Sequence, residues 1–244
     1  MNCWICGDLA STGEHKTKKS DMRSVLGSPT QAQPLFYHSR TAKNRRIGSL
    51  NNNFLKSASR LCAKCNNQRT QPHDRAWESL SFWLRTRNPP IKSGDVVRAD
   101  RIFACNASMQ MRYVQLYFTK LTGCHFVETN MKFDATSFSK SILTGRINPY
   151  VYLKFGLYDD EMVGMSDLKA ATLTSDGSCA FATWFYCLGR LAVNVMYAIE
   201  GEQRQGLVGA WHPSSGSNRI LIADFPYQAP LPRYQRGITF GYSK

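Results

Sequence analysis

The sequence predicts an α+β protein in two parts, a small metal-stapled module at residues 1–88 and a mainly antiparallel α+β domain at residues 91–244. Three observations predict this division. Two Cys-x-x-Cys pairs in the first part can close around one metal ion. Tandem prolines at Pro89 and Pro90 mark a stiff boundary, and beyond them short β-type runs alternate with turn residues. A chain of 244 residues can bury one sizeable core and carry a second small module.

The two cysteine pairs predict a structural zinc site. A Cys-x-x-Cys pair presents two sulfurs to one ion, and two such pairs complete a closed tetrahedral shell. Metal binding would also explain how a segment with few aliphatic residues folds. Disulfides are the alternative, disfavoured because the first residues lack the charged and apolar segments of a secretory signal. The predicted ligands are Cys3, Cys6, Cys62 and Cys65.

The other cysteines, Cys105, Cys124, Cys179 and Cys187, have no short paired spacing, and we expect them to be small buried hydrophobic residues. The longest apolar stretch without charge, about residues 177–189, is too short to cross a hydrocarbon layer of about 30 Å. We therefore expect a soluble, cytoplasmic protein without a membrane partner.

Charge is concentrated in the first part of the chain. Residues 1–90 contain 15 Lys and Arg against 5 Asp and Glu, whereas residues 91–244 contain 16 against 12. Such a basic segment favours a polyanionic partner, and lysine and arginine contacts to a DNA backbone are the functional interpretation. For the basic residues around position 45, a flexible polar loop is the alternative. The candidate nucleic-acid-binding residues are Lys16, Lys18 and Lys19, then Lys43, Arg45 and Arg46, and finally Arg69.

An acid, an imidazole and a carboxamide accompany the cysteine pairs. Glu14 and His15 lie between the pairs, and Asn66 directly follows Cys65. Carboxylate and amide oxygens suit a hard divalent cation, and a neutral imidazole beside it can take a proton from water. This combination predicts a metal-dependent nuclease.

The order Cys3-x2-Cys6, Glu14-His15, Cys62-x2-Cys65-Asn66 resembles the zinc-containing branch of the HNH endonucleases, phage and bacterial proteins with a ββα-metal fold. The resemblance covers about residues 1–85. It implies that Glu14 and Asn66 bind catalytic Mg²⁺ or Mn²⁺ and that His15 is the general base. The family's middle asparagine, which holds the loop beside the histidine, has three candidates, Asn51, Asn52 and Asn53, and Asn53 is favoured.

The sequence departs from that family in two places. The interval between His15 and Cys62 is 46 residues, so residues 26–55 are expected to form an insertion. Pro72 interrupts the helix that usually follows the second cysteine pair. Whether His73 or Asp74 returns to the metal, or serves on the surface or as a helix cap, is left open by the pattern.

Two helices and six strands complete the prediction. Pro72 begins a helix with an apolar stripe that runs through Arg87, and Asn106 caps a second helix that Gly123 ends. The tail around Pro226, Pro230 and Pro232 is expected to be extended. The expected strands are residues 150–157, 168–173, 180–188, 191–199, 206–211 and 219–225.

Three functions are compatible with these patterns. The leading hypothesis is an HNH-type endonuclease that hydrolyses phosphodiester bonds of duplex, nicked or branched DNA, with the second domain recognising substrate or partners. A non-catalytic zinc-knuckle protein that binds nucleic acid is the alternative. A third possibility is an interaction protein in which zinc only staples the N-terminus. The pattern indicates neither the target nor the oligomeric state.

Overall fold

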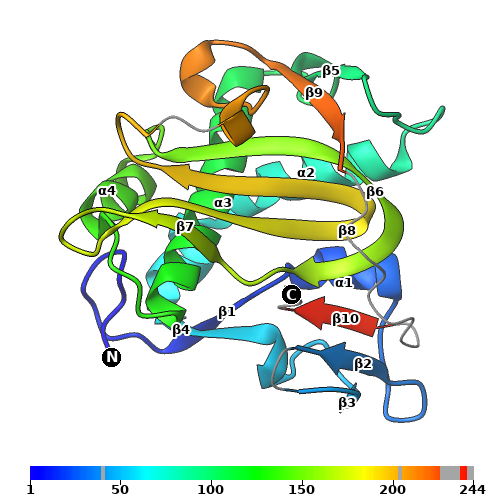
Figure 1. Ribbon diagram of the computed structural model, residues 1–244. Helices are drawn as coiled ribbons and strands as arrows, with labels where there is room; N and C mark the ends of the chain where they lie inside the picture. The colour runs from blue at the N-terminus through cyan, green and yellow to red at the C-terminus, as the bar shows by residue number, and fades with distance from the viewer. Residues whose placement is uncertain (40–41, 203–204, 226–236, 241–244) are drawn as a thin grey trace.

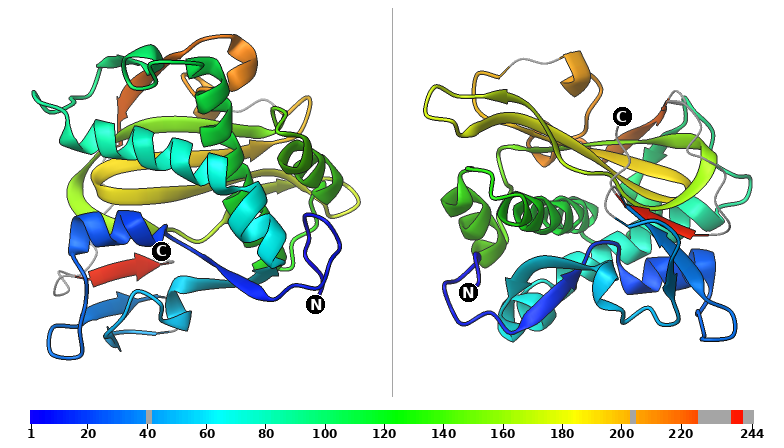
Figure 2. Two further views of the ribbon diagram at one scale, coloured as in Figure 1. Left: turned by 180° about the vertical axis from the view of Figure 1, so that it is seen from behind. Right: turned by 60° about the horizontal axis from the view of Figure 1, so that its bottom comes forward.

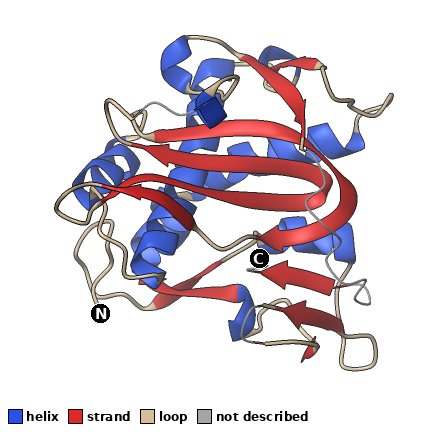
Figure 3. Ribbon diagram, viewed as in Figure 1, coloured by secondary structure: helices blue, strands red, loops and turns tan. Residues whose placement is uncertain are grey.

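The computed structural model describes residues 1–39, 42–202, 205–225 and 237–240, and its architecture is mixed α+β. A large sheet forms one layer, and three helices pack against one of its faces (Figures 1 and 2). Figure 3 colours the strands of the large sheet and of a separate two-stranded pair red. A separate pair of antiparallel strands, β1 (Thr12–His15) and β4 (Lys56–Leu61), lies beside this layer, with Thr12 opposite Leu61.

The large sheet has eight strands among the described residues. Its main path runs β3-β2-β10-β6-β8-β7, and β9 pairs with another part of β6 and with β5. The strands are β2 (Leu35–His38), β3 (Arg45–Ile47), β5 (Val96–Arg98), β6 (Val151–Met165), β7 (Lys169–Leu173), β8 (Cys179–Ala198), β9 (Arg219–Asp224) and β10 (Gly237–Phe240).

The expectation of a mainly antiparallel sheet holds for four of the seven described strand pairs, and the other three pairs are parallel. The central pairs β6–β8 and β7–β8 are antiparallel, but β10 is parallel to both β2 and β6, and β9 is parallel to β6. Parallel neighbours need long connections, and these strands are indeed joined through distant parts of the chain rather than through tight turns. The sheet is therefore mixed.

Four helices are present in the described part of the chain. They are α1 (Lys19–Leu26), α2 (Gln71–Thr86), α3 (Ala107–Glu128) and α4 (Ala135–Thr144). The predicted helix at Pro72 corresponds to α2, whose proline lies in the first turn where a missing N–H costs nothing. None of the described helices is long and apolar enough to cross a membrane.

The second predicted helix is longer than expected. It continues through Gly123 to Glu128, so Gly123 does not end it. An added Cβ at Gly123 would lie 2.4 Å from a ring carbon of Trp4. The glycine is thus a contact point at which the N-terminal segment approaches α3.

Three of the predicted strands do not form as separate strands in the structure. The runs 180–188 and 191–199 form the single strand β8, in which Gly189 has a φ of 61°. Glycine tolerates this left-handed conformation, so the strand can bend without ending. Residues 206–211 contain a short 3-10 turn and one bridge between Leu153 and Trp211 instead of a strand. The predicted extended tail at residues 226–236 lies outside the described residues.

One continuous core joins the two predicted parts. Trp77 of α2 stacks on Tyr117 of α3 at 5.7 Å between ring centroids and makes edge contacts with Phe118 and with Tyr186 of β8. All four rings are at most 1% exposed. The tandem prolines therefore do not coincide with a break in the core.

A buried carboxylate ties α1 to this core. Asp21 Oδ2 accepts hydrogen bonds from Trp77 Nε1 at 2.7 Å and from the Tyr186 hydroxyl at 2.9 Å. Its other oxygen accepts from Ser81 Oγ at 3.2 Å. Buried acids are stable only with such donors around them. The network holds α1 against α2 and β8.

Among the remaining cysteines, Cys124, Cys179 and Cys187 are buried as expected. Cys105 is exposed, which corrects the prediction for that residue. It lies in the turn that precedes α3, where the surrounding apolar residues of the sequence do not enclose it.

Candidate metal centre and adjoining cavity

The four predicted cysteine ligands come together in space. Their Sγ atoms all lie within 4.8 Å of one another, and all four thiols are free of disulfides. Sulfurs around a tetrahedral Zn²⁺, each about 2.3 Å from the ion, would be roughly 3.8 Å apart. The cluster of Cys3, Cys6, Cys62 and Cys65, here called the cysteine cluster, could therefore hold one metal ion such as zinc.

Local backbone bonds shape both halves of the cysteine cluster. A tight turn after Cys3 is closed by bonds from Gly7 N to Cys3 O and from Cys3 N to Asp8 O, both 2.8 Å. The second pair lies where β4 ends and a π-helical turn begins, and there Cys65 N donates to Cys62 Sγ at 3.3 Å. The cluster packs on Cys124 of α3 and Ile142 of α4, so it is anchored to the second part of the chain.

Arg69, a candidate for nucleic-acid contact, is placed at the cysteine cluster instead. Its Nη1 donates to Cys65 Sγ at 3.1 Å. A guanidinium beside a sulfur favours the thiolate form that binds metal. In this structure the side chain supports the cysteine cluster.

A cavity of about 390 Å³, here called the site cavity, adjoins the turn that carries Cys65. It unites Glu14 and His15 of β1 with Asn66, although more than fifty residues separate them in the sequence. Acids, bases and amides all face it. Its lining residues are Gly13, Glu14, His15, Lys18, Lys19, Ser20, Arg23, Asn66, Asn67, Asp74 and Glu78.

His15 is held in one orientation by a backbone carbonyl. Its Nε2 lies 3.0 Å from Leu50 O, and because a carbonyl only accepts, this bond needs the proton on Nε2. Nδ1 is then an unprotonated acceptor. Burial lowers the pKa of His15, and the bond to Leu50 opposes that change only partly. The imidazole is therefore neutral near pH 7.

The register of β1 and β4 shifts between Gly13 and His15, an irregularity that redirects side chains at a strand end.

Asn52 organises the loop that carries Leu50. Its Oδ1 accepts from Phe54 N at 3.0 Å, and its carbonyl accepts from Leu55 N at 3.1 Å. Asn51 Oδ1 accepts from Lys19 Nζ at 2.7 Å. Asn53, the favoured candidate for this role, has an exposed side chain on the same turn. Of the three asparagines, Asn52 makes the contact that shapes the loop.

The side-chain amide of Asn66 is held through its nitrogen. Nδ2 donates to Thr12 Oγ1 at 3.1 Å, which connects the turn after the second cysteine pair to β1. The residue also lines the site cavity. With its nitrogen committed to Thr12, Oδ1 is the atom of Asn66 that can act as a metal ligand.

Glu14 already has a cationic partner. Lys120 of α3 places Nζ 2.9 Å from Glu14 Oε1 and 2.9 Å from Asp74 Oδ1, and its side chain is 0% exposed. Burial raises the pKa of the Glu14 carboxyl, and the ammonium of Lys120 opposes that rise. Burial alone would lower the pKa of Lys120, but Glu14 and Asp74 raise it above its usual value. The ammonium is therefore charged.

Lys120 and Asp74 extend the site beyond the residues that the sequence singled out. Asp74 was one of two undecided positions, and it faces the site cavity. His73 does not line it, but packs on Tyr113 with a ring-centroid distance of 5.2 Å. The sequence signal for Lys120 was available, because it is the only Lys, Arg, Asp or Glu between Arg112 and Glu128 in a largely apolar helix.

The first cluster of basic residues is divided by the structure. Lys18 and Lys19 line the site cavity together with Arg23, which the sequence analysis did not select. Lys16 pairs instead with Glu128 at 2.8 Å. Lys18, Lys19 and Arg23, here called the basic wall, could attract an anion, although Lys18 Nζ also lies 3.4 Å from Glu78 Oε1.

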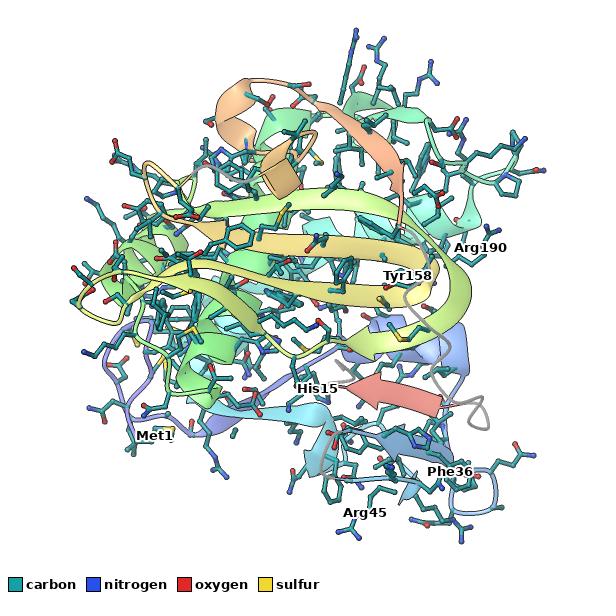
Figure 4. The ribbon with its side chains drawn as sticks, in the orientation of Figure 1. Met1, His15, Phe36, Arg45, Tyr158 and Arg190 are labelled. Atoms are coloured by element: carbon teal, nitrogen blue, oxygen red, sulfur yellow. The ribbon has the colours of Figure 1, made fainter. Side chains whose placement is uncertain are left out.

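The second basic cluster lies at a different place. Lys43, Arg45 and Arg46 are exposed on or beside the outer strand β3, and none of them lines the site cavity. Arg45 stacks over Phe54 at 4.9 Å from the ring centroid. Figure 4 shows Arg45 at the lower edge of the molecule and His15 nearer its centre.

The chain was compared with models of known families, with curated proteins and with solved structures. No family model, no curated protein and no solved structure matches it. A function for this chain is therefore argued from its own residues, chiefly the cysteine cluster and the site cavity.

Proposed function

We propose that the protein is a metal-dependent endonuclease of the HNH type that hydrolyses DNA phosphodiester bonds. The observation that carries the proposal is that Glu14, His15 and Asn66 line one cavity beside the cysteine cluster. The chain order of β1, β4 and α2 around this cavity also agrees with a ββα arrangement. In this proposal the cysteine cluster holds structural Zn²⁺ and the site cavity takes Mg²⁺ or Mn²⁺.

The oxygens of the site cavity suit a hard divalent ion. Glu14 Oε1 is bonded to Lys120, which leaves Oε2 for a ligand, and Asn66 supplies Oδ1. When bound, the ion would reduce the negative charge of the scissile phosphate and stabilise the leaving oxygen. Arg69, which contacts Cys65, has no role in this step.

His15 is the proposed general base. Its bond to Leu50 leaves Nδ1 as the acceptor, and burial keeps the ring neutral at pH values where an exposed histidine begins to titrate. Such an imidazole can take a proton from a water molecule that attacks phosphorus. Asn52 N donates to Ser49 O at 3.1 Å, which closes the turn that contains Leu50 and supports this orientation.

The basic wall of the site cavity supports a polyanionic substrate. Lys18, Lys19 and Arg23 can bind phosphates on either side of the scissile bond, and their attraction weakens as salt rises. Lys43, Arg45 and Arg46 on the outer strand offer a second, separate contact. Duplex, nicked and branched DNA all carry the required phosphates.

A second candidate function has one observation in its favour. Because Lys120 already neutralises Glu14, the acid can exist in the fold without a divalent ion. A zinc-stapled protein that binds nucleic acid without cleaving it would keep the same basic wall.

Nicking of supercoiled plasmid separates these functions. The purified protein is incubated with Mg²⁺ or Mn²⁺, beside EDTA and the variant His15→Ala. The proposed nuclease loses cleavage in both controls, while His15→Ala still binds DNA in a gel-shift assay. His38→Asn is a matched control, because it changes a histidine outside the cavity and places an amide oxygen where Nδ1 accepts from the Asn44 amide. Salt-sensitive DNA binding without any cleavage would favour the binding protein.

A further inference from the structure

Lys120 is the only lysine or arginine that is buried among the residues that the structure describes. It comes from α3, in the part of the chain that the sequence assigned to a second domain. Its Nζ lies between Glu14 Oε1 and Asp74 Oδ1, at 2.9 Å from each, and 3.4 Å from Thr70 Oγ1. Glu14 and Asp74 both line the site cavity, but Lys120 does not. The ammonium thus lies behind the carboxylates, on the side of the core.

Each acid bonds the ammonium through one of its two oxygens, Glu14 Oε1 and Asp74 Oδ1. Glu14 Oε2 and Asp74 Oδ2 are the remaining oxygens, and Asp74 Oδ2 lies 3.9 Å from Lys18 Nζ at the cavity wall. Two carboxylates that share a single cation in this way are also arranged to share a divalent ion.

The position of the ammonium is one that a divalent ion could occupy. Mg²⁺ binds carboxylate oxygens at about 2.1 Å, somewhat closer than the 2.9 Å contacts made by Lys120. Without the ammonium, two partly buried carboxylates would face each other with no cation between them. Such a pair would attract a divalent ion into the space behind them, away from His15 and Asn66.

We propose that Lys120 is a positioning residue that excludes the divalent ion from the space behind Glu14 and Asp74 and keeps it on the cavity side, near Asn66 and His15. Asp74 thereby becomes a further acid of the ion site. This inference rests on the ion site of the proposed function. It also means that the site is completed by α3, from the second part of the chain.

A purely structural role for Lys120 leads to a different expectation. An ion pair that only joins α3 to β1 and α2 would leave ion affinity unchanged when it is removed. A positioning role predicts instead that ion affinity rises while the rate falls, because the ion binds tightly in the wrong place. This split between binding and rate is what the experiment measures.

The test uses the zinc-loaded, full-length protein and measures Mn²⁺ binding from the electron paramagnetic resonance signal of the free ion. Lys120→Met keeps the apolar stem of the side chain as far as its last carbon and removes the charged ammonium. We expect the dissociation constant for Mn²⁺ to fall at least tenfold and the nicking rate at saturating Mn²⁺ to fall at least tenfold. Circular dichroism checks the fold. If Lys120→Met does not fold, Lys120→Gln, which also removes the charge but keeps a polar end, carries the same expectation.

Lys16→Met is the matched control. It also removes one positive charge close to Glu14 in the sequence, but Lys16 pairs with Glu128 and does not line the site cavity. Its Mn²⁺ affinity should change less than threefold. A similar gain in both variants would attribute the effect to net charge and would overturn the inference.

The outcomes separate the inference from the proposed function. Unchanged or weaker Mn²⁺ binding by folded Lys120→Met overturns the inference, and cleavage by the wild-type protein would still support the nuclease. Tighter Mn²⁺ binding by Lys120→Met, when the wild-type protein never cleaves DNA, supports the role of Lys120 at the ion site and rejects the nuclease. A wild-type protein that binds no Mn²⁺ overturns the inference.

Discussion

Replacing Tyr186 with phenylalanine removes one buried oxygen that three partners share. The hydroxyl donates to Asp21 Oδ2 at 2.9 Å, and it lies 3.2 Å from the Tyr117 hydroxyl and 3.0 Å from Lys18 N, both of which donate to it. The aromatic ring, which packs edge-on against Trp77, is kept. The substitution therefore tests the polar network that joins α1 to β8 with little change in packing.

The cost follows from these contacts. A hydrogen bond to a buried carboxylate contributes about 1.5–3 kcal/mol, and each buried donor left without a partner costs about 1–3 kcal/mol. Asp21 keeps its hydrogen bonds from Trp77 and Ser81, so the buried carboxylate still has donors to both of its oxygens. We expect Tyr186→Phe to lower the free energy of unfolding by about 2.5–6 kcal/mol, a large part of a typical total of about 5–15 kcal/mol.

Urea unfolding followed by tryptophan fluorescence and circular dichroism measures this change. Tyr117→Phe is the matched control, since it removes from the network only the donor at 3.2 Å and should cost about 0.5–1.5 kcal/mol. Because one core spans both parts of the chain, amide exchange should show α2 and β8 losing protection together. A cost of Tyr186→Phe no larger than that of Tyr117→Phe would refute the reasoning.

Two further predictions concern metal and pH. Cys65→Ser should lose the bound metal and destabilise the whole protein rather than residues 1–85 alone. The cysteine cluster packs on α3 and α4, and structural zinc can supply about 10–16 kcal/mol of folding free energy. Metal analysis and thermal unfolding check this, and full metal content with unchanged unfolding would contradict it. Burial lowers the pKa of His73 and of His125 to about 4, whereas unfolded histidines titrate near 6.5. The unfolded state therefore binds more protons below pH 6.5, and stability should fall by about 2 kcal/mol per histidine between pH 7.5 and 5. Urea midpoints at the two pH values, with zinc content monitored, should show a smaller fall in His73→Gln; equal falls in both proteins would count against this cause.

The candidate site was predictable where its chemistry is encoded in short spacings. Two Cys-x-x-Cys pairs must approach one another to bind one ion, and their sulfurs do lie together. Glu14 and His15 are adjacent in the sequence, and Asn66 follows Cys65, so a closed cysteine cluster brings these residues near each other. Asp74 and Lys120 were not predictable as partners, since 46 residues separate them and only helix packing brings them together.

Helices and strands were also predictable only where short sequence patterns encode them. The apolar stripe of α2 repeats at helical spacing, so its existence and its start at Pro72 could be read directly. Gly123 was interpreted as a helix stop because glycine often ends helices, and residues 189–190 were left between two predicted strands. In the structure Gly123 gives room to Trp4, and Gly189 adopts a left-handed conformation inside β8. Neither role is visible without the neighbouring residues.

The sequence by itself determined the cysteine cluster, the adjacent acid and imidazole, the basic first part and the α+β class, because these depend on residue type and on spacings of a few residues. Only the tertiary structure decided the mixed sheet, the continuous core across the tandem prolines and the position of Lys120 between Glu14 and Asp74. Those features depend on which distant segments pack together. That choice is made by burial and charge pairing over the whole chain, and no local pattern encodes it.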